Sequence, residues 1–347
     1  MPKVSVLLPI YNAERYLQET LDSLFAQTFT DFEIIAVDDG SSDASIKILK
    51  NNTDSRLKVV SNEKNLGISD TLNRAISIAT GQYLARMDAD DIAYPSRFEK
   101  QVAYLDSHPE VDVLGTWFRL FGGTVPQVIE NPVDHAGIQA ALIFDSALGH
   151  PTVMIRASSL TKVTHAYDAK FNKAEDYEFW TRGSNQLVYA NLPEVLLDYR
   201  IHRQQTGSTS TSAQTRLADQ VRLAYLEQLG IRLSDPSKQI HLELAHYQFG
   251  KMRVHDFMKV DTYLKEMTDY LRETPTLKIA LLKEFERYFT HHFYRDYFNQ
   301  PSKHFIRERN LFNPSRVSLN KKIFWISRSL REPLIRILRP VRKFFKS

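Results

Sequence analysis

The chain of 347 residues contains no cysteine, which excludes disulfides and cysteine-held metal sites. Any metal must therefore be held by oxygen or imidazole ligands. No uninterrupted apolar run approaches the roughly 20 residues that a bilayer-spanning helix requires, which argues against an integral helical membrane protein. The first residues also lack a basic segment followed by a long apolar one, so we expect an unsecreted protein.

Glycine is scarce where nucleotide-binding loops need it. None precedes Gly40, whereas the first βα turn of a dinucleotide-binding dehydrogenase carries Gly-x-Gly-x-x-Gly to let the backbone approach a pyrophosphate. No Gly-Lys-Ser or Gly-Lys-Thr occurs, which excludes a P-loop, and the first strand lacks the basic Gly-rich loop usual in nucleotidyl transferases. Phosphates must be held by something other than a backbone nest.

The formal charge of +4 combines two parts of opposite sign. Residues 321–347 hold nine Lys or Arg against one Glu, so the other 320 residues sum to −4, which argues against nucleic-acid binding by the body. In the tail, apolar and basic residues alternate at helical spacing around Pro333 and Pro340. This pattern predicts two short amphipathic segments on an anionic membrane surface. The alternatives are a helix packed on the fold, a dimer contact and a nucleic-acid arm.

Strand-like runs alternate with helical patterns in the first half, which predicts parallel βαβ units and an α/β fold. Strands are expected at 4–8, 32–37, 57–60 and 83–87, and helices at 14–26, from 44, through 80 and at 95–106. An apolar stretch at 111–121 ends in Gly122-Gly123, which predicts a hairpin turn. The pattern is helical from about residue 216. We therefore expect domains at 1–210 and 211–320, followed by the tail at 321–347.

The segment Met87-Asp88-Ala89-Asp90-Asp91 places three carboxylates within five residues. Like charges this close repel one another unless a cation lies among them. Because the segment follows an apolar run, the acids are expected at the carboxyl end of a strand, where α/β sheets bind ligands. Oxygen ligands suit Mg²⁺ or Mn²⁺ better than zinc. A divalent cation here would take the role of the missing phosphate-binding loop.

Acids also follow the second predicted strand, in Asp38-Asp39-Gly40. Carboxylates at a strand end can accept hydrogen bonds from a ribose or a base, so we expect Asp38 and Asp39 to bind a ligand, while Ser42 or Asp43 caps the next helix. The loop after the first strand should lie beside them in a parallel sheet. Its Tyr11 could stack on a base.

Seven motifs in order resemble those of family 2 glycosyltransferases with the GT-A fold, of the bacterial surface-polysaccharide type, over about residues 3–210. They are VSVLLPIYN from Val4, VDDGSSD from Val37, NLG from Asn65, ARMDADD from Ala85, HPTVM from His150, EDY from Glu175 and YRIH from Tyr199. Two details depart from the family pattern. Arg74 shifts the basic residue that usually follows the third motif, and His165-Ala166-Tyr167 replaces Gly-Gly-Tyr.

The resemblance implies a Rossmann-like mixed sheet flanked by helices, then a mainly helical C-terminal region. It implies inverting transfer of a sugar from a nucleotide donor, usually UDP-linked, to an acceptor hydroxyl. The implied metal ligands are Asp90, Asp88 and His202, with Asp91 holding the loop or coordinating through water. The implied donor-binding residues are Pro9, Tyr11, Asn12, Glu14, Asp38, Asp39, Asn65, Gly67, Asn73, Arg86, Asp88 and Arg200.

The same resemblance implies that Asp176 is the catalytic base, with Glu175 as the second candidate. On the residues alone, both acids would equally well complement the dipole at the start of a helix. Likewise, an isolated histidine such as His202 is more often structural than chemical, and Arg86 could simply form an ion pair. Trp117 and Trp180 are expected in the core.

The expected partners are a nucleotide-sugar donor, an acceptor glycan or lipid-linked glycan of capsule or lipopolysaccharide type, and Mn²⁺ or Mg²⁺ as cofactor. The chain should be cytoplasmic and peripheral on the inner face of the cytoplasmic membrane, held there by residues 321–347. The alternative function is a catalytically inactive nucleotide-sugar-binding scaffold at the membrane. A membrane- or nucleic-acid-binding protein with a merely structural α/β half is a third possibility.

Overall fold

The computed structural model describes residues 1–123, 126–202, 212–246, 262–263 and 266–267. The chain divides into a compact unit over Met1–Gly230 and a second unit over Ile231–Ser347. Every residue that the sequence analysis assigns to the site lies in the first unit. No helix among the described residues is long and apolar enough to cross a bilayer. The tail at 321–347 and most of the predicted domain at 211–320 lie outside the described residues, so both remain predictions.

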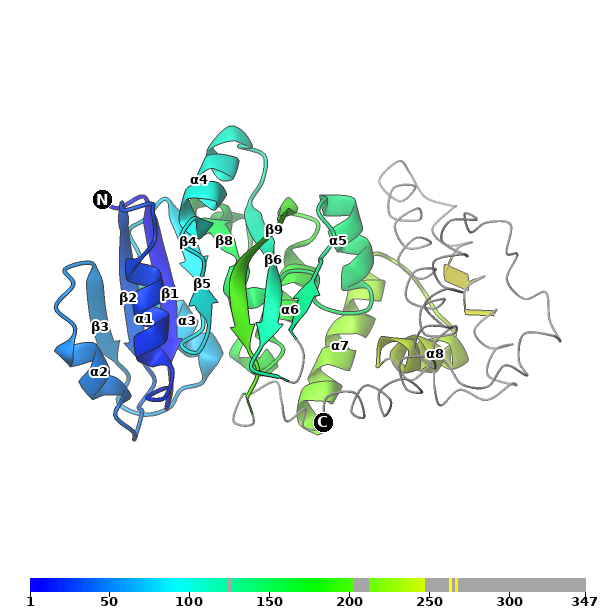
Figure 1. The fold of residues 1–347 in the computed structure, drawn as a ribbon. Coiled ribbons are helices and arrows are strands. Elements are labelled where there is room, and N and C mark those ends of the chain that lie inside the picture. The colour runs from blue at the N-terminus through cyan, green and yellow to red at the C-terminus, as the bar shows by residue number, and fades with distance from the viewer. Residues whose placement is uncertain (124–125, 203–211, 247–261, 264–265, 268–347) are drawn as a thin grey trace, which may run out of the picture. The chain divides into compact units, whose positions relative to one another are not determined.

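A mixed sheet forms the centre of the first unit (Figure 1). The described strands follow the order β3-β2-β1-β4-β8-β6-β9-β5, with β7 paired to β6. The strands are β1 Val4–Ile10, β2 Phe32–Asp38, β3 Leu57–Ser61, β4 Tyr83–Arg86, β5 Ile92–Ala93, β6 Val113–Phe121, β7 Gln127–Ile129, β8 Met154–Arg156 and β9 Tyr189–Arg200. The strands β1 to β4 are parallel, as predicted, whereas β8 runs antiparallel to β4.

Helices flank the sheet because their apolar residues recur on one side. In α1, for example, Leu17, Leu21 and Leu24 are fully buried, and the helix lies across β1 and β2 in Figure 1. All seven residues of β1 and of β2 are buried, as expected for central parallel strands covered on both faces. The helices are α1 Leu17–Phe25, α2 Ser45–Asn51, α3 Ile68–Ile78, α4 Arg97–Ser107, α5 His135–Leu142, α6 Glu175–Gly183, α7 Ser212–Gln228 and α8 Asp235–Ala245.

Some predicted boundaries differ from the structure for local reasons. The first helix starts at Leu17 rather than at Glu14, because the Glu14 carboxylate accepts the N–H of Ala44 (2.8 Å) and the preceding loop is bonded to the next one. The predicted hairpin after Gly122 is confirmed, since β7 returns antiparallel along β6 and Gly122 has a φ of 84°. The long strand β9 was not predicted.

The helical pattern expected from about residue 216 is also confirmed for the described part. The helix α7 begins at Ser212 and belongs to the first unit, where it packs on α6. Its Arg222 Nε donates to the carbonyl of Phe144 (2.6 Å), and Gln228 Nε2 donates to the carbonyl of Thr181 (3.0 Å). The second bond connects α7 to α6, which carries the Glu-Asp motif, and the first connects it to the segment after α5.

The parallel register brings several loops to one edge of the sheet. Ile10 pairs with Asp38, and Leu7 pairs with Arg86, so the loops after β1, β2 and β4 leave the sheet together. The turn after β2 requires Gly40, whose φ is 72° and whose Cβ, if present, would lie 2.9 Å from the backbone of Lys64. The predicted neighbourhood of these loops is confirmed.

Candidate active site

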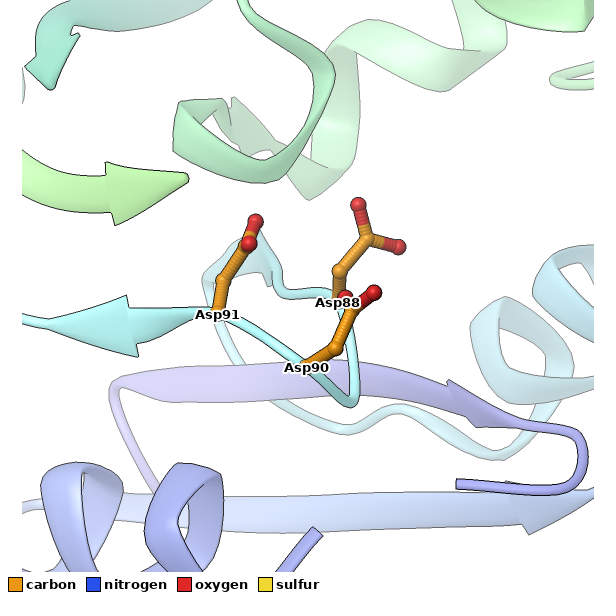
Figure 2. Close-up of side chains that lie close together, drawn as sticks. All are labelled: Asp88, Asp90 and Asp91. Carbon is orange, nitrogen blue, oxygen red and sulfur yellow. The ribbon is translucent and has the colours of Figure 1, made fainter. Parts of the chain in front are cut away.

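The three carboxylates of the loop between β4 and β5 rise on one side of it, as Figure 2 shows. Asp88, Asp90 and Asp91 each offer an oxygen, and these atoms all lie within 4.8 Å of one another. His202, two residues after the end of β9, places its Nε2 2.8 Å from Oδ2 of Asp90. The structure thus brings together the residues that the sequence analysis assigned to a metal.

Asp91 holds the loop in place. It is fully buried, its Oδ1 accepts the N–H of Arg200 (2.8 Å), and its carbonyl accepts the hydroxyl of Thr20 (2.8 Å). Arg200 also donates from Nε to the carbonyl of Asp90 (2.7 Å) and pairs with Glu19. Its guanidinium therefore fastens the acidic loop to α1, and donor binding by Arg200 stays a prediction.

Arg86 is the buried cation of the site. Its Nη1 forms an ion pair with Oδ2 of Asp88, while its Nε is buried without a hydrogen-bond partner among the described residues. Although burial opposes the charged form, the carboxylate of Asp88 raises the pKa of Arg86 above its ordinary value. The charge of Arg86 also acts on Glu175 and Asp176, which favours their ionised forms. The charge of Arg86 therefore stabilises ionised carboxylates in both acidic motifs.

The acidic loop fits a hard divalent cation. Burial, and next to it the charge of Asp88, raises the pKa of Asp90, as expected for a carboxylate that lacks a sufficient counter-charge. Oδ2 of Asp91 is buried with no hydrogen-bond partner in the described part of the chain. Carboxylate oxygens are the ligands that Mg²⁺ and Mn²⁺ prefer, and His202 places an imidazole nitrogen beside them.

The second acidic motif begins α6. Glu175 is 7% exposed, and burial together with the charge of Asp176 raises its pKa to about 7. Its Oε2 is buried without a hydrogen-bond partner within the described ranges. Asp176 is partly exposed, and burial raises its pKa above the ordinary value. A carboxylate with a raised pKa is a stronger base than one in water.

His150 and Tyr167 contact each other, and His150 lies close to Glu175 of this motif. Nε2 of His150 lies 2.9 Å from the Tyr167 hydroxyl, and its Nδ1 lies 3.9 Å from Oε1 of Glu175. Burial and the charge of Arg86 hold the pKa of His150 well below its usual range, so the imidazole is neutral. Trp180, whose ring meets His150 edge-on, is fully buried, which confirms its predicted place in the core.

The loops after β1 and β2 are bonded to each other. Oδ1 of Asn12 accepts the N–H of Ser42 (2.9 Å), and Asp43 accepts the N–H groups of Glu14 and Ser45 (both 2.9 Å). Tyr11 lies in this loop with 53% of its surface exposed, open to a stacking partner. Pro9 lies within β1 and is buried.

The other predicted donor-binding residues differ in whether their side chains already form hydrogen bonds within the protein. Asp38 keeps Oδ1 buried without a described hydrogen-bond partner, whereas Asp39 accepts from Nδ2 of Asn62 (2.7 Å) and from the N–H groups of Leu66 (2.8 Å) and Gly67 (2.9 Å). Asp39 therefore shapes the loop after β3. Asn65 in that loop is exposed.

Asn73 contacts the backbone of Tyr167 through both ends of its amide. Its Nδ2 donates to the Tyr167 carbonyl (2.8 Å), and its Oδ1 accepts the Tyr167 N–H (3.2 Å). The neighbouring Arg74 donates to the carbonyl of Ser61 (2.9 Å). Both side chains thus connect segments at the rim of the site, and donor binding by Asn73 stays a prediction.

Two groups that shape the acidic loop were not predicted from the sequence. The ring of Tyr16 packs on the ring of His202 (4.9 Å between centroids) and under the guanidinium of Arg200 (4.4 Å). Arg97 is fully buried behind the loop, and burial lowers its pKa to about 9. The only signal for Arg97 in the sequence is a charged residue beside Phe98, on the apolar side of an expected helix.

Comparison with known proteins identifies the family. The sequence matches glycosyl transferase family 2 over residues 5–156. An uncharacterized glycosyltransferase of Haemophilus influenzae is 33% identical over 261 residues, which cover 71% of this chain and 81% of that protein. The O-antigen biosynthesis glycosyltransferase WbnJ of Escherichia coli is 34% identical over 216 residues, which cover 60% of this chain and 83% of that protein.

Solved structures agree on the fold. TarS of S. aureus, residues 1–349 in complex with UDP-GlcNAc, has a TM-score of 0.55 at 20% identity and covers 83% of this chain and 92% of its own. The mannosyltransferase PcManGT of Pyrobaculum calidifontis, in complex with GDP-Man and Mn²⁺, has a TM-score of 0.51 at 16% identity and covers 85% and 83%. This chain therefore belongs to glycosyl transferase family 2, has the GT-A fold that its motifs predict, and is a glycosyltransferase.

Proposed function

We propose that the enzyme transfers a sugar from a UDP-linked donor to a hydroxyl of a glycan or lipid-linked glycan, with inversion at the anomeric carbon. One observation carries this proposal. Arg86 interacts with two separate acidic groups, pairing with Asp88 of the first and acting electrostatically on Glu175 and Asp176 of the second. Such a division suits a donor diphosphate at the first group and an acceptor hydroxyl at the second.

The donor site would form at the loop edge of the sheet. Asp88, Asp90 and His202 would hold Mg²⁺ or Mn²⁺, which when bound acts as a Lewis acid towards the diphosphate leaving group. Tyr11 offers an exposed ring to the base, and Asp38 offers an unused buried oxygen to the ribose or base. PcManGT binds GDP-Man with Mn²⁺ and TarS binds UDP-GlcNAc, which supports this type of donor.

Asp176 would accept the proton of the attacking hydroxyl. Single displacement needs a base on the side opposite the departing diphosphate, and Asp176 is the partly exposed acid of its motif while Glu175 is nearly covered. Its raised pKa makes it a better proton acceptor than an acid in water. Glu175, with its unpartnered Oε2, would accept a hydrogen bond from a bound hydroxyl or remain protonated and donate one.

The acceptor is proposed from relatives and from the sequence. WbnJ acts in O-antigen biosynthesis by its name, which supports a surface polysaccharide or a lipid-linked precursor here. The basic tail at 321–347 would hold the enzyme on the cytoplasmic face of the membrane. Deleting residues 321–347 should move the enzyme from the membrane to the soluble fraction, and an unchanged distribution would refute the anchoring role.

Release of the nucleoside diphosphate tests the proposed reaction. Purified enzyme is incubated with UDP- and GDP-sugars, with Mn²⁺ and with polyprenyl-linked or oligosaccharide acceptors, alongside Asp176→Asn. We expect acceptor-dependent UDP release by the native enzyme only, while Asp176→Asn still binds UDP. Binding without turnover in the native enzyme would instead favour an inactive nucleotide-sugar-binding scaffold.

A further inference from the structure

Arg97 is buried at a place where packing alone would favour an apolar residue. Its side chain is fully buried, and its three hydrogen bonds all go to neutral groups. A guanidinium buried without an ion-paired carboxylate destabilises the folded state. The presence of a charged residue at this position therefore needs an explanation other than the stability of the core.

The bonds of Arg97 reach the base of the acidic loop. Nη2 donates to the carbonyl of Arg86 (2.8 Å), the last residue of β4, and Nη1 contacts Sδ of Met87 (3.3 Å). These residues directly precede Asp88. The charge of Arg97 also interacts favourably with the carboxylate of Asp91, the acid buried deepest in the cluster.

Gln101 connects Arg97 to β6 and to the turn that carries His150. One helical turn after Arg97 on α4, its Oε1 accepts from Nε of Arg97 (3.1 Å). Its Nε2 donates to the carbonyls of Leu114 on β6 (3.1 Å) and Thr152 (2.8 Å). Thr152 ends the turn that carries His150, the neighbour of Glu175.

We infer that Arg97 and Gln101 are positioning residues that hold the metal-binding loop, and with it the turn of His150, in the geometry that binds the donor. The inference rests on the proposed metal-dependent donor site. Partners behind a ligating residue keep it oriented, and their removal typically weakens metal binding by about 10- to 100-fold. A residue that merely fills the core would lower stability without changing affinity.

Binding of Mn²⁺ at a saturating concentration of UDP, measured by isothermal titration calorimetry, separates these possibilities. Arg97→Met should weaken Mn²⁺ binding by about tenfold or more. Arg97→Lys, which keeps the charge but loses the fork of bonds, should weaken it less. The matched control is Arg156→Met, because Arg156 also bonds to backbone carbonyls but pairs with Tyr83 at the opposite end of β4. It should lower the melting temperature and leave the Kd for Mn²⁺ unchanged.

If Arg97→Met does not fold, Arg97→Lys and Gln101→Met decide the matter, since the first keeps the positive charge and the second keeps the bond from Arg97 to the carbonyl of Arg86. Unchanged affinity in the Arg97 and Gln101 variants, with melting temperatures lowered as in Arg156→Met, would overturn the positioning role alone. A native enzyme that binds neither UDP nor GDP with Mn²⁺ would refute the proposed donor site, and the positioning role with it.

Discussion

Replacing Glu175 with Gln should change how the stability of the enzyme depends on pH. Glu175 is nearly covered, its Oε2 lacks a hydrogen-bond partner among the described residues, and its pKa rises from the ordinary 4.5 to about 7 through burial and the charge of Asp176. A raised folded-state pKa means that the native protein holds this proton more tightly than the unfolded chain. The stabilisation is therefore fully present below pH 4.5 and is lost as the pH rises towards 7.

The size of the expected change in stability follows from the pKa shift of Glu175. A pKa difference of this size corresponds to about 3 kcal/mol, of which about 2 to 3 kcal/mol falls between pH 5 and pH 8. Gln cannot ionise and fills the same space. Relative to the native enzyme, Glu175→Gln should thus gain about 2 to 3 kcal/mol in the free energy of unfolding on going from pH 5 to pH 8.

Urea unfolding of both proteins at pH 5 and pH 8 measures this difference. Glu178→Gln serves as the matched control, because Glu178 lies on the same helix but is paired with Arg182 (2.6 Å). Its difference from the native enzyme should be the same at both pH values. A Glu175→Gln difference that is also independent of pH would show that Glu175 is ionised in the folded enzyme, and the reasoning from its burial would be wrong.

Three further predictions concern the loops, the aromatic support and the base. Tyr16→Ala should weaken Mn²⁺ binding at saturating UDP by about tenfold, since the ring packs on His202, while Tyr16→Phe should bind like the native enzyme; equal calorimetric affinities for all three would contradict this. Gly40→Ala should lower the free energy of unfolding by at least about 1 kcal/mol, because of its positive φ and the close backbone of Lys64; a urea midpoint equal to that of the native enzyme would refute it. The turnover rate should fall as the pH drops through the raised pKa of Asp176, and a rate that rises on acidification would exclude this acid as the base.

The sequence was sufficient for the parallel half of the sheet. Local periodicity predicted the alternation of strands and helices, and the acids after β2 and β4 were recognisable because parallel strands share one carboxyl edge. The start of α1 was not predictable in the same way. It depends on the bond between Glu14 and the N–H of Ala44, a contact between separate loops that no local pattern records.

Two features of the site depend on long-range packing. His202 reaches Asp90 because β9 pairs with β6 and β5, and this pairing is set by the whole sheet and not by the residues of β9 alone. Arg97 was missed because charged residues are normally assigned to the surface. Its burial becomes understandable only once the carbonyl of Arg86 and the side chain of Gln101 are placed beside it.

The response of the melting temperature to nucleotides tests the central claim most directly. A ligand that binds only the native state must raise the melting temperature, so native enzyme and Asp90→Ala are compared with UDP and GDP, each with and without Mn²⁺. We predict that UDP stabilises the native enzyme only when Mn²⁺ is present and that Asp90→Ala loses this response. An equal response without Mn²⁺, or one that survives in Asp90→Ala, would contradict a donor site built on the acidic loop.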